Sequence, residues 1–234
     1  MTDYPPLAVK VWGERACFTR PEMKVERVSY PVMTPSAARG VLEAIFWKPE
    51  FSWRVREIWV LKPIRHFSIV RNEVNSVASE KSARSWDRSG GGYFAEEDRA
   101  QPHTLGLRDV AYLIRADVVL RPHATEDVAK YRDQFRRRVG RGQCHHRPYL
   151  GCREFAADFG PPDGSEAPVD LTDELGRMLF DQAFEPDSLG QVSWSAHDHS
   201  GVRVVRGRVQ PRFFAAWLEQ GVLRVPAELY SKGE

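Results

Sequence analysis

The order of strand-like and helix-like segments is the feature that most constrains the fold of this 234-residue chain. Apolar residues that alternate predict strands, and apolar residues spaced by three or four predict helices. On this basis we expect a strand at 7–13, a helix at 35–48, strand structure within 55–71, a strand at 111–120, a helix at 124–139 and a strand at 150–159. The order strand, helix, strand, strand, helix, strand is typical of the ferredoxin-like or RRM-like fold, so the sequence predicts an α+β N-terminal domain.

Local signals place the helix starts and one long loop. Thr34 before Pro35 predicts an N-cap with proline in the first turn, and Thr125 is the predicted cap of the second helix. Residues 76–101 are polar and contain three consecutive glycines, so we predict a long loop there. Loops of this length in compact proteins are often functional or disordered.

A glycine- and proline-rich segment at 160–165 predicts a domain boundary. We therefore expect an RRM-like domain at 1–159 and a small antiparallel β domain at 160–234. Short strands are predicted in the second part at 177–184, 202–209, 213–217 and 222–225.

Composition restricts the class of protein. With 42% hydrophobic residues and seven Trp, the chain can bury a substantial core. It has no apolar run near the ~18 residues that a membrane helix requires, and residues 1–6 lack signal-peptide features. Three cysteines, an odd number, argue against a disulfide scaffold. We expect a cytoplasmic protein with no membrane partner.

The formal net charge of +2 conceals two opposite blocks. Residues 130–153 contain eight basic residues and one acid, whereas residues 163–187 contain eight acids and one base. A concentrated basic segment is typical of a protein that binds a polyanion. It is equally typical of a solvated helix face beside an acidic neighbour, and charge alone does not decide between the two. The candidate nucleic-acid-binding residues of this block are Arg136, Arg137, Arg138, Arg141 and Arg147.

A smaller basic cluster near the N-terminus contains Arg20 and Lys24, interleaved with aromatic residues such as Phe18 and Tyr30. Basic side chains bind phosphates and aromatic faces stack on unpaired bases. The same pattern occurs in any half-buried antiparallel strand, which is the more common cause.

Four residues are candidates for catalysis. Lys130 is predicted to flank the apolar face of the second helix, although a solvent-facing lysine is the more common case, and Tyr131 falls on that apolar face. His145 and His146 lie in a basic loop, where imidazoles titrate near neutral pH and can transfer protons. The alternative is that they are polar loop residues without a catalytic role. The spacing of these histidines with Cys144 and Cys152 matches no regular zinc pattern, so we expect no metal site.

The chain has no phosphate-binding P-loop, no dinucleotide fingerprint and no nucleophile elbow, so we expect no cofactor. If the protein cleaves nucleic acid, metal-independent RNA cleavage fits best. In that reaction the 2′-hydroxyl attacks the adjacent phosphate, and the protein supplies a base, a cation and in-line positioning.

Several blocks in the same order give a specific resemblance across nearly the whole chain. They are residues 16–22, 29–30, 35–40, 45–49, 71–74, 135–138 and 149–155. The chain resembles the fifth family of CRISPR-associated (Cas) proteins, subtype I-C. The resemblance implies an RRM-like N-terminal domain, a small β C-terminal domain, and metal-independent cleavage of CRISPR precursor RNA within the repeat. It also implies that the crRNA 5′ handle is retained in the Cascade complex.

The family's catalytic residues match this chain only in part. Some members of the family use a Tyr at the end of the first helix and a Lys-His pair on the second. This chain has Phe46 at the first place, and Lys130 followed by Tyr131 at the pair. The resemblance implies that Lys130 stabilises the scissile phosphate, while Tyr131 or one of the histidines transfers protons.

Three functional hypotheses follow. The first is an endoribonuclease that acts on a repeat stem-loop, retains the mature crRNA and joins the other type I-C Cascade subunits. The second is a non-catalytic subunit that binds crRNA, because Phe46 has no hydroxyl and Tyr131 no imidazole. The third is weaker, general binding of duplex DNA by the basic helix.

Overall fold

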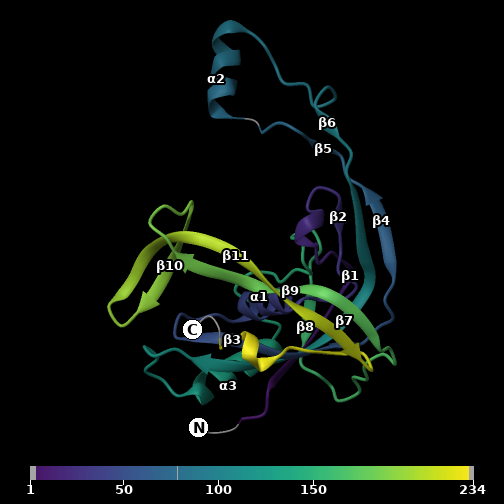
Figure 1. The fold of residues 1–234 in the computed structure, drawn as a ribbon, viewed down its shortest axis with the longest axis vertical. Coiled ribbons are helices and arrows are strands. Elements are labelled where there is room, and N and C mark those ends of the chain that lie inside the picture. The colour runs from purple at the N-terminus through teal and green to yellow at the C-terminus, as the bar shows by residue number, and fades with distance from the viewer. Residues whose placement is uncertain (1–3, 78, 232–234) are drawn as a thin grey trace.

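Ten strands of the protein form one sheet, from which a long arm projects (Figure 1). The computed structural model describes residues 4–77 and 79–231. The helices are α1 (Pro35–Ile45), α2 (Glu80–Ser89) and α3 (Val128–Gly140). The strands are β1 (Leu7–Ala16), β2 (Arg27–Val28), β3 (Phe51–Val60), β4 (His66–Val70), β5 (Glu73–Val74), β6 (Arg99–Ala100), β7 (His103–Leu120), β8 (Asp158–Gly160), β9 (Asp173–Pro186), β10 (Val192–Asp198), β11 (Gly201–Glu219) and β12 (Val222–Arg224).

Strand β7 lies at the centre of the sheet. It pairs with β1 on one side and β3 on the other, both antiparallel, while its N-terminal half pairs with β4 and β2. The main path through the sheet runs β10-β11-β12-β3-β7-β1-β8. Helix α1 packs on β3, and α3 packs on β7, β1 and β8. The protein is therefore a mixed α/β structure built on a large antiparallel sheet.

Aromatic side chains join α3 and the end of α1 to the sheet. Phe51 of β3 lies 5.3 Å from Tyr131 and 5.4 Å from Phe46, measured between ring centroids. Trp53 of the same strand lies 4.8 Å from Phe135. All five side chains are buried. Because β3 alternates buried and partly exposed residues, every second side chain faces these helices.

The first predicted helix is confirmed, although it ends at Ile45 rather than at residue 48, because Phe46 already has an extended backbone. The start of the second helix was placed too early. Thr34 Oγ1 accepts a hydrogen bond of 3.2 Å from the amide of Ala37, as expected for an N-cap. Helix α3 begins at Val128, and its cap is Asp127, which accepts from the amide of Ala129 at 2.7 Å. Thr125 was therefore the wrong cap, because a carboxylate nearer the helix occupies the capping position.

Two predicted segments differ from the structure. Residues 76–101 are not a simple loop, because they contain α2, which is capped by Ser79 and lies at the tip of the arm. Ala78 lies outside the described residues. The predicted strand at 150–159 is largely turns, and only Asp158–Gly160 pairs with β1. The turns arise because Gly151 has a positive φ of 86° and packs against the backbone of Cys17.

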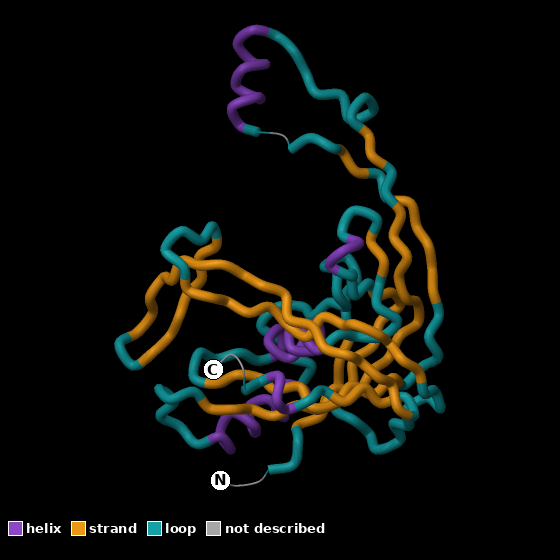
Figure 2. Tube along the Cα trace, in the orientation of Figure 1, coloured by secondary structure: helices purple, strands orange, loops and turns teal. Residues whose placement is uncertain are grey.

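The C-terminal strands continue the same sheet (Figure 2). The predicted strands at 202–209 and 213–217 are parts of one long strand, β11, which pairs antiparallel with β9. Strand β10, which the sequence did not predict, pairs with the other end of β11, and β12 joins β3. The boundary near residue 160 stays a prediction.

None of the helices in the described residues is long and apolar enough to span a bilayer. Residues 1–3, part of the N-terminal segment considered above, lie outside the described residues.

A bidentate ion pair links α1 to β9. The guanidinium of Arg39 donates to both carboxylate oxygens of Asp181, at 2.7 and 2.8 Å, and to Glu43 at 2.8 Å. Both side chains of the Arg39–Asp181 pair are largely shielded from solvent. Paired N–H···O bonds of this kind fix orientation as well as distance, so this contact holds α1 against the strand that covers it.

Replacement of Asp181 by alanine should lower the free energy of unfolding by about 2 kcal/mol, because it leaves a shielded guanidinium without its main partner. Urea denaturation followed by circular dichroism would measure the change. The matched control is Glu219→Ala, which removes an exposed ion pair with Arg224 and should cost less than about 1 kcal/mol. Equal losses in the two variants would contradict this role for Asp181.

Candidate functional site

Lys130 lies in the first turn of α3 with its side chain exposed. Its Nζ is 2.6 Å from Glu126 Oε1. The hydrogen bond that Lys130 donates to Glu126 is the main cause that raises the pKa of Lys130, so the ammonium remains charged at neutral pH. A phosphate that approaches this ammonium would have to compete with the carboxylate of Glu126.

Tyr131 is the next residue, but it faces the opposite way, into the core beside Phe51. Burial is the main cause that raises the pKa of its phenol, and the nearby carboxylates of Glu50 and Glu126 act in the same direction. The phenol is therefore protonated at neutral pH. A proton donor is compatible with this state, whereas a general base would need the opposite shift.

His145 and His146 lie in the exposed loop after α3. Their backbone amides donate to the carbonyl of Ala44 near the end of α1, at 2.8 and 3.3 Å. The two imidazole rings meet edge to face, with centroids 5.6 Å apart. Phe46, at the end of the same helix, is buried and packs on Phe51, so it contributes only to the core.

The structure does not bring all four candidate catalytic residues together. Lys130 lies at the start of α3 and the histidines follow its end. Ten residues of helix separate Lys130 from Gly140, a rise of about 15 Å. Lys130 with Glu126 and the His145–His146 pair therefore form two separate groups, at opposite ends of α3.

The arginines of α3 and the following loop divide into two types. Arg137 and Arg141 are exposed and have no ion pair within the described part of the chain. Arg136 and Arg147 are also exposed but pair with Asp133 and Asp158, at 3.1 and 3.2 Å. These four guanidinium groups can reach a ligand in solution.

Arg138 and Arg132 instead hold the structure together. Arg138 donates to the carbonyl of Ile45 at 2.9 Å and lies over the ring of Phe46, which completes the end of α1. Arg132 is buried and donates to the carbonyl of Pro5 at 2.6 Å. The side chain of Arg138, predicted to bind nucleic acid, thus already has a structural partner.

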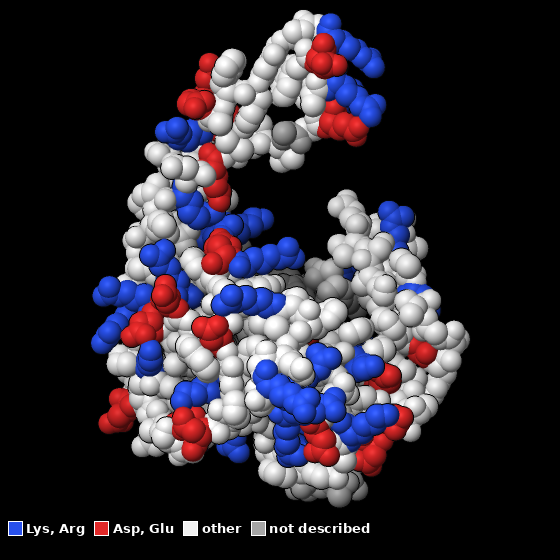
Figure 3. All heavy atoms as spheres, turned by 180° about the vertical axis from the view of Figure 1, so that it is seen from behind, with Lys and Arg blue, Asp and Glu red and all other residues white. Residues whose placement is uncertain are grey.

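The N-terminal basic cluster is smaller than the sequence suggested. Arg20 lies over the ring of Tyr30 at 4.6 Å and within 3.9 Å of Glu22, while Lys24 is exposed. Seen from behind, Lys and Arg side chains gather in two regions (Figure 3). One region, in the lower part of this reversed view, corresponds to the position of α3 in Figure 1. The other region lies towards the base of the arm.

A groove that the sequence did not reveal lies between α1, the ends of β3 and β7, and the antiparallel pair of β9 and β11. Its volume is about 680 Å³. Arginine and aromatic side chains from distant parts of the chain line it: Arg39, Arg54, Arg121, Arg212, Trp53, Phe180, Phe184 and Tyr230. No local pattern could have identified this set, because six separate segments of the chain contribute to it.

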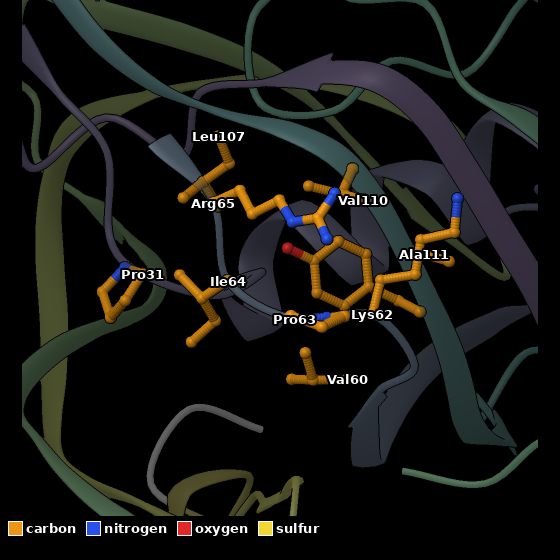
Figure 4. A pocket seen from close by; sticks show the side chains of 10 residues that line it. Pro31, Val60, Lys62, Pro63, Ile64, Arg65, Leu107, Val110 and Ala111 are labelled. Carbon is orange, nitrogen blue, oxygen red and sulfur yellow. The ribbon is translucent and has the colours of Figure 1, made fainter. Parts of the chain in front are cut away.

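A second hollow, lined in part by Ile64, Arg65 and Val110, is shown in Figure 4. Its volume is only about 10 Å³, which is about the space that one water molecule needs. It is too small for a nucleotide. The described residues also contain no group of three or more His, Cys, Asp or Glu side chains placed to hold a metal ion.

Known structures share this architecture. The crystal structure of a CRISPR-associated protein has a TM-score of 0.61 and 21% identity to this chain, with 97% of this chain and 95% of the other covered. A functionally uncharacterized protein from Streptococcus mutans also has a TM-score of 0.61, at 18% identity, with the same coverage. These similarities concern the fold alone.

Sequence similarity identifies the family as well as the fold. The chain is 52% identical over 226 residues to a CRISPR pre-crRNA endoribonuclease Cas5d from Thermus thermophilus, with 97% of this chain and 93% of the relative covered. It is 42% identical over 226 residues to a protein of the same name from Mannheimia succiniciproducens, with 94% of each covered. The family model for Cas5d, described as CRISPR-associated protein (Cas_Cas5), matches residues 6–226. On these matches, which extend over almost its full length, the chain belongs to the Cas5d family of CRISPR-associated proteins.

Proposed function

We propose that this protein is a CRISPR pre-crRNA endoribonuclease that cleaves within the repeat and retains the 5′ handle of the crRNA in a type I-C Cascade complex. The observation that carries the proposal is the 52% identity, over 97% of the chain, to a relative with this named activity. The exposed arginines of α3 and the loop after it support RNA as the ligand, because they offer charges to a phosphate backbone.

The proposal includes a ferredoxin-like arrangement for the N-terminal part, at residues 1–159. The strand order β3-β7-β1-β8, antiparallel throughout, supports it, as do α1 and α3 packed against these strands. In this arrangement α3 presents its polar side to solvent beside the sheet. Residues 160–234 would then form the second, β-rich part.

In the proposed reaction the 2′-hydroxyl attacks the adjacent phosphate, so the protein needs no metal to activate water. Lys130 stabilises the charge that develops on the phosphate oxygens. When RNA binds, the Lys130 ammonium leaves Glu126 and pairs with the phosphate instead. Tyr131 is protonated at neutral pH, but its phenol is buried in the core, so a role as proton donor requires that RNA binding expose it. The His145–His146 pair, at the other end of α3, is the alternative site of proton transfer.

The second hypothesis, a non-catalytic crRNA-binding subunit, retains one specific argument: Phe46 and Tyr131 are both core residues. Incubation of the purified protein with repeat RNA in EDTA distinguishes the two. Cleavage by 2′-hydroxyl attack should continue without metal and leave a 2′,3′-cyclic phosphate, detectable by mass spectrometry. RNA that is bound but remains intact, in EDTA and in Mg²⁺ alike, would establish the binding subunit and overturn the enzyme.

We expect Lys130→Ala to lower the single-turnover cleavage rate about 100-fold, because one preorganised charge at a phosphate contributes on this scale. The affinity for repeat RNA should change less than about threefold, since many other cations contact the backbone. The matched control is Lys62→Ala, which removes another exposed lysine paired with a carboxylate, Asp109. Cleavage by Lys130→Ala at the parental rate would exclude the proposed role.

We expect Arg137→Ala to weaken the binding of repeat RNA and to lower the slope of log K against log salt by about 0.7–0.9, the loss of one phosphate contact. Arg138→Ala is the structural comparison: it should lower the melting temperature but leave this slope unchanged, because its guanidinium already binds Ile45. An unchanged slope in Arg137→Ala would contradict the proposal that this side of α3 contacts RNA. Competition with duplex DNA in the same assay tests the weaker, general DNA binding.

A further inference from the structure

Two of the three cysteines meet where β1 ends. Cys17 follows β1 directly and is fully buried, while Cys152 lies in the turn before β8 and is half-buried. The backbones beside them are paired, since the amide of Cys17 donates to the carbonyl of Leu150 at 3.0 Å. Gly151 lies so close to Cys17 that a Cβ added to it would be 2.0 Å from the Cys17 carbonyl oxygen. The two backbone segments that contain Cys17 and Cys152 are therefore in direct contact.

The thiols share their surroundings. Thr19 Oγ1 lies 3.5 Å from Cys17 Sγ and 3.8 Å from Cys152 Sγ. Cys152 Sγ also donates to the carbonyl oxygen of Cys17, at 3.5 Å. The Thr19 hydroxyl, which is near both sulfurs, is thus placed to donate to a thiolate at Cys152.

A charged pair flanks Cys152. Arg27 Nη1 lies 3.6 Å from Cys152 Sγ and 2.6 Å from Glu154 Oε1. The adjacent Cys17 thiol is the main cause that lowers the pKa of Cys152 to about 6; Thr19 and Arg27 act in the same direction, whereas burial and the Glu154 carboxylate oppose it. The Cys152 thiol and burial raise the pKa of Cys17. Cys152 is therefore the thiol that ionises first, and Cys17 keeps its proton.

We propose that Cys152 and Cys17 form a peroxide-sensitive thiol pair, in which Cys152 is the attacking thiol and Cys17 the resolving thiol. The geometry that supports the pair is the shared Thr19 hydroxyl, the guanidinium beside Cys152 and the partial exposure of Cys152. Reactive cysteines occur in such partly exposed, electropositive surroundings. The proposal is independent of the nuclease activity.

The chemistry takes two steps. The Cys152 thiolate attacks one oxygen of hydrogen peroxide, the O–O bond breaks, and the products are a sulfenic acid and hydroxide. The Cys17 sulfur then attacks the Cys152 sulfur, and a disulfide forms as the S–O bond breaks. The proton of Cys17 leaves with the departing oxygen as water. Two sulfurs are oxidised by two electrons in total, and one peroxide is reduced.

The disulfide would connect two walls of one cavity. Thr19 and Gly151, the neighbours of the two cysteines, line a hollow of about 270 Å³ together with Ser36 at the start of α1 and the exposed ring of Tyr149. The bond would close a loop between residues 135 positions apart, which restricts the unfolded chain. Oxidation would thus fix the turn at 149–152 to the end of β1.

The experiment treats the folded, full-length protein with hydrogen peroxide and maps peptides under non-reducing conditions. We expect a peptide that links Cys17 to Cys152, lighter by two hydrogens, and its loss after reduction. The exposed Cys144 is the internal control for simple accessibility. Oxidation of Cys144 before the pair, or the absence of the linked peptide while the pair remains reduced, would overturn the proposal.

Variants separate the two roles. Cys17→Ser should stop at the sulfenic acid on Cys152, which dimedone captures, whereas Cys152→Ser should leave Cys17 unmodified. Cys144→Ser should form the linked peptide at the parental rate. Arg27→Gln should slow the alkylation of Cys152 by iodoacetamide at pH 7 several-fold, with circular dichroism to confirm folding. Dimedone capture on Cys17 in Cys152→Ser would reverse the assignment and refute it.

Discussion

The pairing of β7 is the constraint on which the rest of this structure depends. This strand spans His103–Leu120 and pairs with β1 and β3 along its C-terminal half, and with β4 and β2 along its N-terminal half. Since both edges of β7 are paired, its backbone groups are satisfied and most of its apolar side chains are buried between neighbours. The position of α3, which follows β7 after a short connection and packs back onto it, is a direct consequence.

Helix α3 combines structural and exposed arginines within a few residues. Its inner face carries Tyr131 and Phe135 into the aromatic core, and Arg132 and Arg138 are drawn towards backbone carbonyls of Pro5 and Ile45. The remaining charges point to solvent. A run of basic residues therefore overstates the number that can bind a phosphate, because backbone carbonyls also accept hydrogen bonds from guanidinium groups.

The candidate site was predictable only in its residue types. The sequence singled out Lys130, Tyr131, His145 and His146, but the helix places the lysine and the histidines at its opposite ends. Periodicity correctly placed Tyr131 on the buried face. It could not show the ion pair of Lys130 with Glu126, since flanking residues on a helix are equally able to face solvent without a partner. The groove lined by Arg121 and Arg212 depends on contacts between distant segments.

The sequence by itself determined the first strand, α1 with its cap Thr34, and the basic character of α3 and its loop, because these follow from local periodicity and capping chemistry. It also contains the residue blocks by which the chain resembles the fifth family of Cas proteins. Tertiary structure alone decided that the C-terminal strands extend the same sheet, that residues 76–101 include a helix on an arm, and that Cys17 meets Cys152. The physical reason is that strand pairing and side-chain contacts between segments more than a hundred residues apart leave no periodic trace in either segment.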